Sequence, residues 1–265
     1  MNIDNSNYKY RLGLAKELEL LKTLLFSVNV QKKSIDSIDR AVKCLKDKNF
    51  LPRIKQDESE EEVASPLSWG YSIKGFVIQI DLSGTLQYPK TITNASLEFS
   101  INLNGIYCDP SEEIRDPFNH LEFNIVIQGN SRKRKEHVLS YHLDRHIEGE
   151  KESNEVHPIY HFQIGGRKID DYKLKQKNFG NQLIIDSPRF MHYPMDFIAG
   201  LDFVLSNFAP DIWRKLKRDP RYIRIIKSSQ ARTIKPFIAS LAKHFEFHNP
   251  SNNTWGSKKI CPQLA

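Results

Sequence analysis

Residues 94–107, N-A-S-L-E-F-S-I-N-L-N-G-I-Y, carry the pattern that decides the fold class of this 265-residue chain. Leu97, Phe99, Ile101 and Leu103 alternate with polar residues, as expected for a strand with one buried face. Four further segments have strand-like composition with no helical pattern between them: 69–81, 120–128, 136–147 and 157–164. Consecutive strands without intervening helices favour an antiparallel sheet of about five strands, arranged as a meander or partly curled.

Helical periodicity flanks the strand-rich region on both sides. Before it, apolar residues recur with helical spacing over 8–28 and 33–47, which predicts a helical hairpin. After it, Asp196 and the pair Asp219 and Pro220 are helix-start signals, and the spacing predicts helices over about 196–207, 219–228 and 233–247. The predicted fold class is therefore α+β, with an N-terminal helical hairpin, a central antiparallel β-sheet and basic C-terminal helices.

Composition changes divide the chain into successive parts. A run of acidic residues ends at Ser65 and Pro66, which is typical of an exposed connection. The predicted parts are an N-terminal helical hairpin (1–56), an acidic linker (57–66), an antiparallel β domain (67–186), a basic helical region packed on the sheet (187–248) and a loose tail (249–265).

Several protein classes are disfavoured by the composition. Three widely spaced cysteines provide neither a disulfide framework nor a cysteine-built metal site, so we expect a cytoplasmic location. The chain shows no apolar signal core and no apolar run approaching about 18 residues, which predicts no membrane partner. Glycine loops for phosphates, dinucleotide fingerprints and nucleophile elbows are missing from the sequence.

Positive charge is concentrated near the C-terminus. The whole chain has a net charge of +7, yet residues 211–265 alone hold 12 Lys/Arg against 3 Asp/Glu, a net of +9. These cations recur every three or four residues, so in a helix they share a face, with Trp213 and Tyr222 interleaved. Such an asymmetry indicates a polyanionic partner. The simpler alternative is a solvated surface that keeps the protein soluble.

Arginines beside aromatic rings can hold phosphates and stack on bases. The leading hypothesis is therefore a protein that binds RNA or single-stranded nucleic acid as a subunit of a larger cytosolic assembly. The residues expected to contact nucleic acid are Arg132, Lys133, Arg189, Arg214, Lys217, Arg218, Arg221, Arg224, Lys227, Arg232 and Lys235.

Histidines gather on two predicted strands, where Y-H-L-D-R-H (141–146) and H-P-I-Y-H-F-Q-I (157–164) flank a polar link. Symmetric pairing about that link places His142 opposite His161 and His146 opposite His157. Asp144 then shares their face, and the opposite face is apolar. A slide of the register by two residues keeps these faces and changes the partners. Residues 136–147 also fit a helix, which is the alternative for that segment.

This histidine face supports a rival hypothesis, a His-dependent nuclease or phosphoesterase of a toxin-like or defence type, because histidine exchanges protons near neutral pH. No cofactor is predicted; a divalent metal at the histidine face is the alternative, as is a polar sheet face without chemistry. A third class is an interaction scaffold, with a protein partner docked on the N-terminal hairpin. The candidate catalytic residues are His142, Asp144, His157, His161 and His192.

Overall fold

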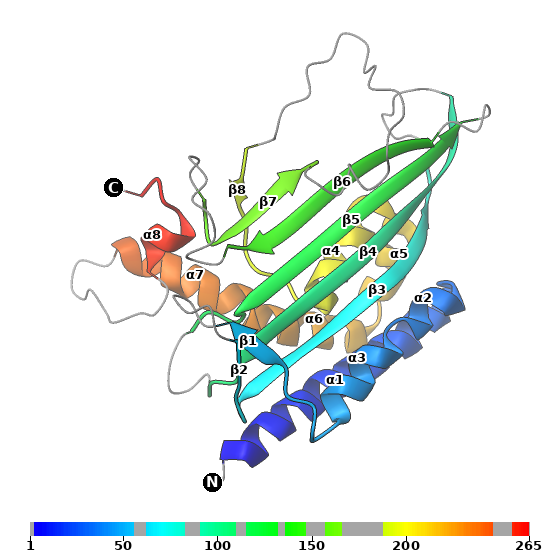
Figure 1. Ribbon diagram of the computed structural model, residues 1–265. Helices are drawn as coiled ribbons and strands as arrows, with labels where there is room; N and C mark the ends of the chain where they lie inside the picture. The colour runs from blue at the N-terminus through cyan, green and yellow to red at the C-terminus, as the bar shows by residue number, and fades with distance from the viewer. Residues whose placement is uncertain are drawn as a thin grey trace.

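The computed structural model describes residues 3–55, 62–82, 91–109, 115–131, 136–146, 157–165, 188–245 and 256–264. Its centre is an open six-stranded antiparallel sheet in the order β3-β4-β5-β6-β7-β8 (Figure 1). Neighbours in the sheet are neighbours in the sequence, so the predicted antiparallel meander is confirmed. The strands are β3 (Ser68–Ile80), β4 (Ile92–Ile106), β5 (His120–Ser131), β6 (Glu136–Arg145), β7 (Tyr160–Ile164) and β8 (Phe190–Met191).

Helices flank the sheet along one edge and across one face. The segments α1 (Ile3–Ser27), α2 (Lys32–Asp36) and α3 (Asp39–Lys46) pack together beside β3. Behind the sheet in Figure 1 lie α4 (Phe197–Phe208), α5 (Pro210–Lys217), α6 (Pro220–Arg232) and α7 (Ile234–Ala242). The α+β class is therefore confirmed. The remaining elements are β1 (Arg53–Lys55), β2 (Glu62–Ala64), η2 (Lys243–Phe245) and α8 (Ser257–Ile260).

The C-terminal helices begin where their capping residues predict. The Asp196 carboxylate accepts hydrogen bonds from the backbone N–H groups of Ile198 and Ala199 at the start of α4. Asp219 caps α6 in the same way, with Pro220 at the first helical position. The helix α6 continues to Arg232, beyond the predicted end near residue 228.

Two layers meet along the apolar face of the sheet. Phe99 on β4 stacks on Phe197 of α4, with ring centroids 5.1 Å apart. A Cβ atom at Gly200 of α4 would lie only 2.4 Å from the ring of Phe123, so glycine permits this close approach. Buried side chains of the hairpin, the sheet and the C-terminal helices belong to one hydrophobic cluster. The apolar stripe of the hairpin is therefore buried within this chain, and a partner would meet its exposed polar side.

Two segments differ from their predicted description. Part of the expected acidic linker forms β2, which pairs with β1 in a small antiparallel sheet. Residues 256–264 are docked on the molecule, since Ile260 is fully buried and the Lys259 carbonyl accepts a hydrogen bond from the Ile159 N–H. A single apolar anchor in a polar tail gives no periodic signal, so the sequence pattern does not reveal this contact. Among the described helices, none is long and apolar enough to cross a membrane.

Candidate functional site

The sheet face turned away from the helices carries a row of polar residues. Across β4, β5, β6 and β7, the register aligns Asn102, Glu122, Asp144 and His161. Alternate residues point the other way, and Phe162 of β7 packs on Phe203 of α4. The predicted division into a polar histidine face and an apolar core face is therefore confirmed.

The predicted partners within this face are wrong by two residues. Residues 136–145 form a strand, and His142 lies opposite Gln163 while Asp144 lies opposite His161. Arg145 then lies opposite Tyr160, and both bind the buried Asp116 carboxylate on the helix side. The Arg145 Nε to Asp116 Oδ2 distance is 2.9 Å. This shared carboxylate favours the observed register, because a shift of β7 by two residues along β6 would carry Tyr160 away from Asp116.

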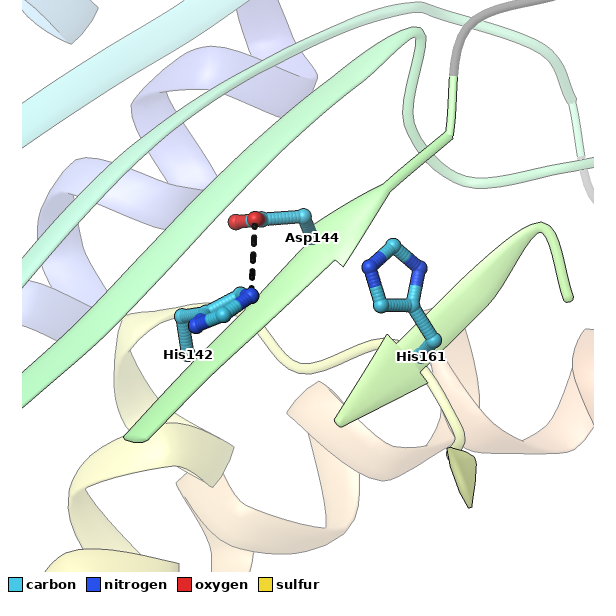
Figure 2. Close-up of side chains that lie close together, drawn as sticks. All are labelled: His142, Asp144 and His161. Atoms are coloured by element: carbon cyan, nitrogen blue, oxygen red, sulfur yellow. Dashed lines mark ion pairs between the residues drawn. The ribbon is translucent and has the colours of Figure 1, made fainter. Parts of the chain in front are cut away.

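Three side chains of the histidine face converge across β6 and β7. Figure 2 shows His142 and Asp144 projecting from β6 and His161 from β7. His142 Nε2 lies 3.7 Å from Asp144 Oδ2 and donates a hydrogen bond to Gln163 Oε1 at 3.0 Å. The ring centroids of His142 and His161 are 6.2 Å apart.

Two further histidines extend the cluster towards the end of the sheet. The His157 ring meets the His161 ring edge to face at 4.8 Å between centroids. His146 stacks on His157 at 4.5 Å, so the pairing of these two rings agrees with prediction although the strand register does not. Four imidazoles therefore form a chain of neighbouring rings, in the order His142, His161, His157 and His146, at one corner of the polar face.

Burial and crowding lower the pKa of two of these rings, His157 and His161, and so favour their neutral form. His161 is only 5% exposed, and burial together with the neighbouring His157 and His142 lowers its pKa to about 4, against the opposing effect of the Pro158 carbonyl. Burial, then the proximity of His146, also lowers the pKa of His157. A neutral imidazole can accept a proton or coordinate a metal. Asp144 remains partly open to solvent, with 37% of its side chain exposed.

The structure separates His192 from the other predicted catalytic residues. Its ring packs between Phe162 and Phe203 on the helix side, and its Nδ1 donates a hydrogen bond to the Tyr193 carbonyl. Burial lowers its pKa. His192, a candidate catalytic residue, therefore lies on the opposite side of the sheet from the histidine face.

The basic C-terminal residues divide into an exposed set and a buried exception. Arg232 points into the protein, where its guanidinium forms ion pairs with Asp196 at 2.6 Å and with Glu17 of α1 at 2.7 Å. Burial alone would lower the pKa of Arg232, but these two carboxylates raise it. The Arg232 guanidinium is therefore not available to contact a phosphate. The exposed cations of α5, α6 and the turn between them, called here the basic ridge, are Arg214, Lys215, Arg218, Arg221, Arg224 and Lys227.

Other predicted contacts lie beside or away from this ridge. Lys235 is exposed on α7, and half-buried Lys217 lies over the Trp213 ring at 5.3 Å from its centroid. Half-buried Arg189 directly precedes β8, in the sheet rather than on the helices. Arg132 and Lys133 fall outside the described residues.

The aromatic residues of this region are engaged inside the protein. Tyr222 is fully buried, and its hydroxyl donates to the Asp202 carboxylate at 3.0 Å. Trp213 Nε1 donates to the same carboxylate at 2.8 Å. The interleaved Tyr222 is therefore not available to stack on bases, because its ring lies on the apolar stripe of α6.

The histidine face and the basic ridge lie on opposite sides of the molecule. The buried sides of α5 and α6 face the other helices, and α4 covers the sheet face that carries Phe99 and Phe123. The helical layer and the sheet therefore separate the two surfaces (Figure 1). Their side chains cannot act together on one small ligand.

Two residues of the histidine face were not among the predicted site residues. Gln163 is buried and hydrogen bonded to His142, and Glu122 is the cross-strand partner of Asp144. Gln163 lies two residues from His161 on β7, so strand alternation is enough to place it on this face. Glu122, by contrast, lies beside Asp144 only because β5 pairs with β6.

Comparisons with known proteins provide no relative for this chain. No protein-family model matches it, and no match was found among curated proteins or solved structures. Its functional chemistry is therefore inferred from the two surfaces themselves.

Proposed function

We propose that the protein binds nucleic acid, RNA or a single strand, through phosphate contacts along the basic ridge. The observation that supports this proposal is that all six cations of the basic ridge, on α5, on α6 and in the turn between them, are exposed. On α6, Arg221, Arg224 and Lys227 recur at three-residue intervals, about 4.5 Å along the helix axis. A stripe of cations at this spacing suits the regularly repeated charges of a phosphate backbone.

Two of these cations pair with nearby carboxylates, but both pairs are exposed, so the cations remain available to phosphate. Arg221 pairs with Asp219, and Arg214 pairs with Asp211, in both cases at the exposed surface. Exposed ion pairs contribute little free energy and are screened by salt, so a phosphate can replace the carboxylate. Arg214, Lys215 and Arg218 also line a shallow pocket together with Asp211, which brings three cations to one spot.

The buried aromatic residues refine the proposed mode of binding. With Tyr222 in the core and Trp213 hydrogen bonded to Asp202, stacking on bases has little support from this region. Phosphate contacts position a nucleic acid but carry no base sequence directly. We therefore expect binding that depends strongly on salt and weakly on sequence.

The test measures the affinity for a labelled single-stranded RNA by fluorescence anisotropy across a salt series. Wild-type affinity should fall with salt, and the triple variant Arg218→Ala, Arg221→Ala, Arg224→Ala should reduce the log–log slope by about 2, or about 0.7 for each lost contact. The matched control is Lys16→Ala, Lys32→Ala, Lys33→Ala, which removes the same charge from exposed positions on α1 and α2.

Equal losses in the two triple variants would contradict a specific ridge, because they would reflect net charge alone. Affinity that does not change with salt would contradict phosphate binding altogether. If an acidic protein binds the ridge and RNA does not compete with it, the scaffold hypothesis replaces this proposal.

A second candidate function is a histidine-dependent phosphoesterase. It is favoured by the gathering of His142, Asp144, His157 and His161 at one corner of the sheet. On this candidate, His157→Gln should abolish cleavage of an activated phosphodiester and leave the thermal midpoint nearly unchanged. Full turnover in that variant would contradict it, and so would a complete lack of turnover in the wild-type protein.

A further inference from the structure

Two histidines and one aspartate offer metal-binding atoms at a single point of the polar face. His142, Asp144 and His161 each provide one ligand atom, and these atoms all lie within 4.8 Å of one another. The three side chains come from adjacent strands, and Figure 2 shows them gathered around the space between β6 and β7. No other group of this kind was found among the described residues.

We infer that His142, Asp144 and His161 form a binding site for one divalent transition-metal ion, with Zn²⁺ as the preferred occupant. Imidazole nitrogens select zinc and its neighbours over magnesium or calcium, and a single carboxylate completes a three-ligand set. Three protein ligands leave a coordination position for water or a ligand. This inference does not depend on nucleic-acid binding, since the site lies across the sheet from the basic ridge.

The strands supply most of the required geometry. With bonds of about 2.1 Å, the ligand atoms of a tetrahedral site lie about 3.4 Å apart. His142 Nε2 and Asp144 Oδ2 are already 3.7 Å apart, because residues two apart on a strand share a face. His161 is the cross-strand neighbour of Asp144, and its ligand atom lies within 4.8 Å of the other two, so a small side-chain adjustment completes the set.

The residues around the three ligands are also compatible with a bound metal ion. Gln163 Oε1 now accepts a hydrogen bond from His142 Nε2, the atom that faces Asp144, and a bound metal would take the place of that proton. Glu122 places a second carboxylate beside Asp144, and a cation relieves the repulsion between cross-strand like charges. Half-exposed Asp144 provides access from solvent, whereas His161 is buried and held by its neighbours.

The test titrates the full-length protein with Zn²⁺ after removal of bound metal by a chelator, using calorimetry. We expect one Zn²⁺ per chain in the wild-type protein. Asp144→Asn and His161→Gln should each weaken binding by about 100-fold or more, since even supporting residues of metal sites contribute 10–100-fold. The matched control is His120→Gln, which removes a histidine of the same sheet face outside the three-residue set and should bind Zn²⁺ like the wild type.

A second readout uses Co²⁺ in place of Zn²⁺, since the intensity of its visible absorption reports coordination geometry. We expect an intense four-coordinate spectrum in the wild type and in His120→Gln, and its loss in Asp144→Asn. Circular dichroism establishes that each variant is folded, and half-exposed Asp144 makes Asp144→Asn the mildest change. A wild-type protein that binds no Zn²⁺ at 100 μM would overturn the inference, as would unchanged binding in folded Asp144→Asn.

Discussion

The hydroxyl of Ser34 satisfies both backbone groups of Val77 at the outer edge of the sheet. Its Oγ donates to the Val77 carbonyl at 2.7 Å and accepts from the Val77 N–H at 3.1 Å. β3 is an edge strand, and the unpaired backbone of an edge strand can pair with another chain. The hairpin therefore protects this edge through a side chain, in addition to packing its apolar stripe.

Ser34→Ala should destabilise the protein by about 1–3 kcal/mol, because it leaves a buried backbone donor and acceptor without their partner. Urea denaturation followed by circular dichroism measures this change. The control Ser27→Ala removes an exposed hydroxyl at the end of α1 and should alter stability by less than about 0.5 kcal/mol. Equal stability of the two variants would contradict the role assigned to Ser34.

Gly200→Ala should loosen the contact between α4 and the sheet. The added methyl group would lie 2.4 Å from the Phe123 ring, which is fully buried and cannot move aside freely. We expect a loss of about 1–3 kcal/mol from overpacking, despite the better helix propensity of alanine. Gly13→Ala on α1 has no neighbour within 4 Å and should instead stabilise the protein slightly. The thermal midpoints of the two variants should therefore move in opposite directions.

Arg232→Met should cost about 3–5 kcal/mol, because it leaves the buried Asp196 and the partly buried Glu17 without their shared cation. Arg224→Met on the same helix removes an exposed cation and should leave stability within about 0.5 kcal/mol. In the RNA assay we expect the opposite order of effects. Arg224→Met should weaken RNA binding more than Arg232→Met, since only Arg224 belongs to the basic ridge. A stable Arg232→Met variant that loses RNA affinity would contradict this division of roles.

His192 should make the protein less stable as the solution becomes acidic. Its pKa is lowered in the folded state by burial, whereas the unfolded chain titrates near pH 6.5. As the pH falls below about 6.5, the unfolded state binds the proton first, so stability declines by up to about 1.4 kcal/mol per pH unit. His192→Phe keeps the contacts with Phe162 and Phe203 and removes this proton.

The measurement is the difference in unfolding free energy between pH 7.5 and pH 5 for wild type and His192→Phe. His157 and His161 titrate in both proteins, so the comparison isolates His192. A smaller difference in the variant is expected, and an identical difference would show that His192 keeps its ordinary pKa.

Strand alternation and capping residues are local signals, and they predicted the meander, the polar face and the helix starts. Strand register is not local. Alternation repeats every two residues and cannot distinguish pairings two residues apart, whereas Asp116, which binds Arg145 and Tyr160, favours one of them. The two-residue strand β8 was missed because so short a segment has no periodicity.

The burial of candidate site residues is likewise not predicted by local sequence patterns. Arg232 follows the spacing of the exposed cations, and its burial depends on Glu17, which belongs to a distant helix. His192 directly follows strand β8 of the same sheet, yet its ring lies on the helix side, where Phe203 contacts it. Spacing thus grouped residues that tertiary packing separates.

The placement of the basic ridge and the histidine face on opposite sides has a thermodynamic consequence. Ligands that bind there do not compete for volume, because the sheet and the helical layer lie between them, and salt screens the attraction or repulsion between exposed charges on the two surfaces. Occupancy of one surface should therefore leave the affinity of the other unchanged, in either order of addition. On the two proposals made above, RNA on one side and a metal ion on the other would occupy the molecule at the same time.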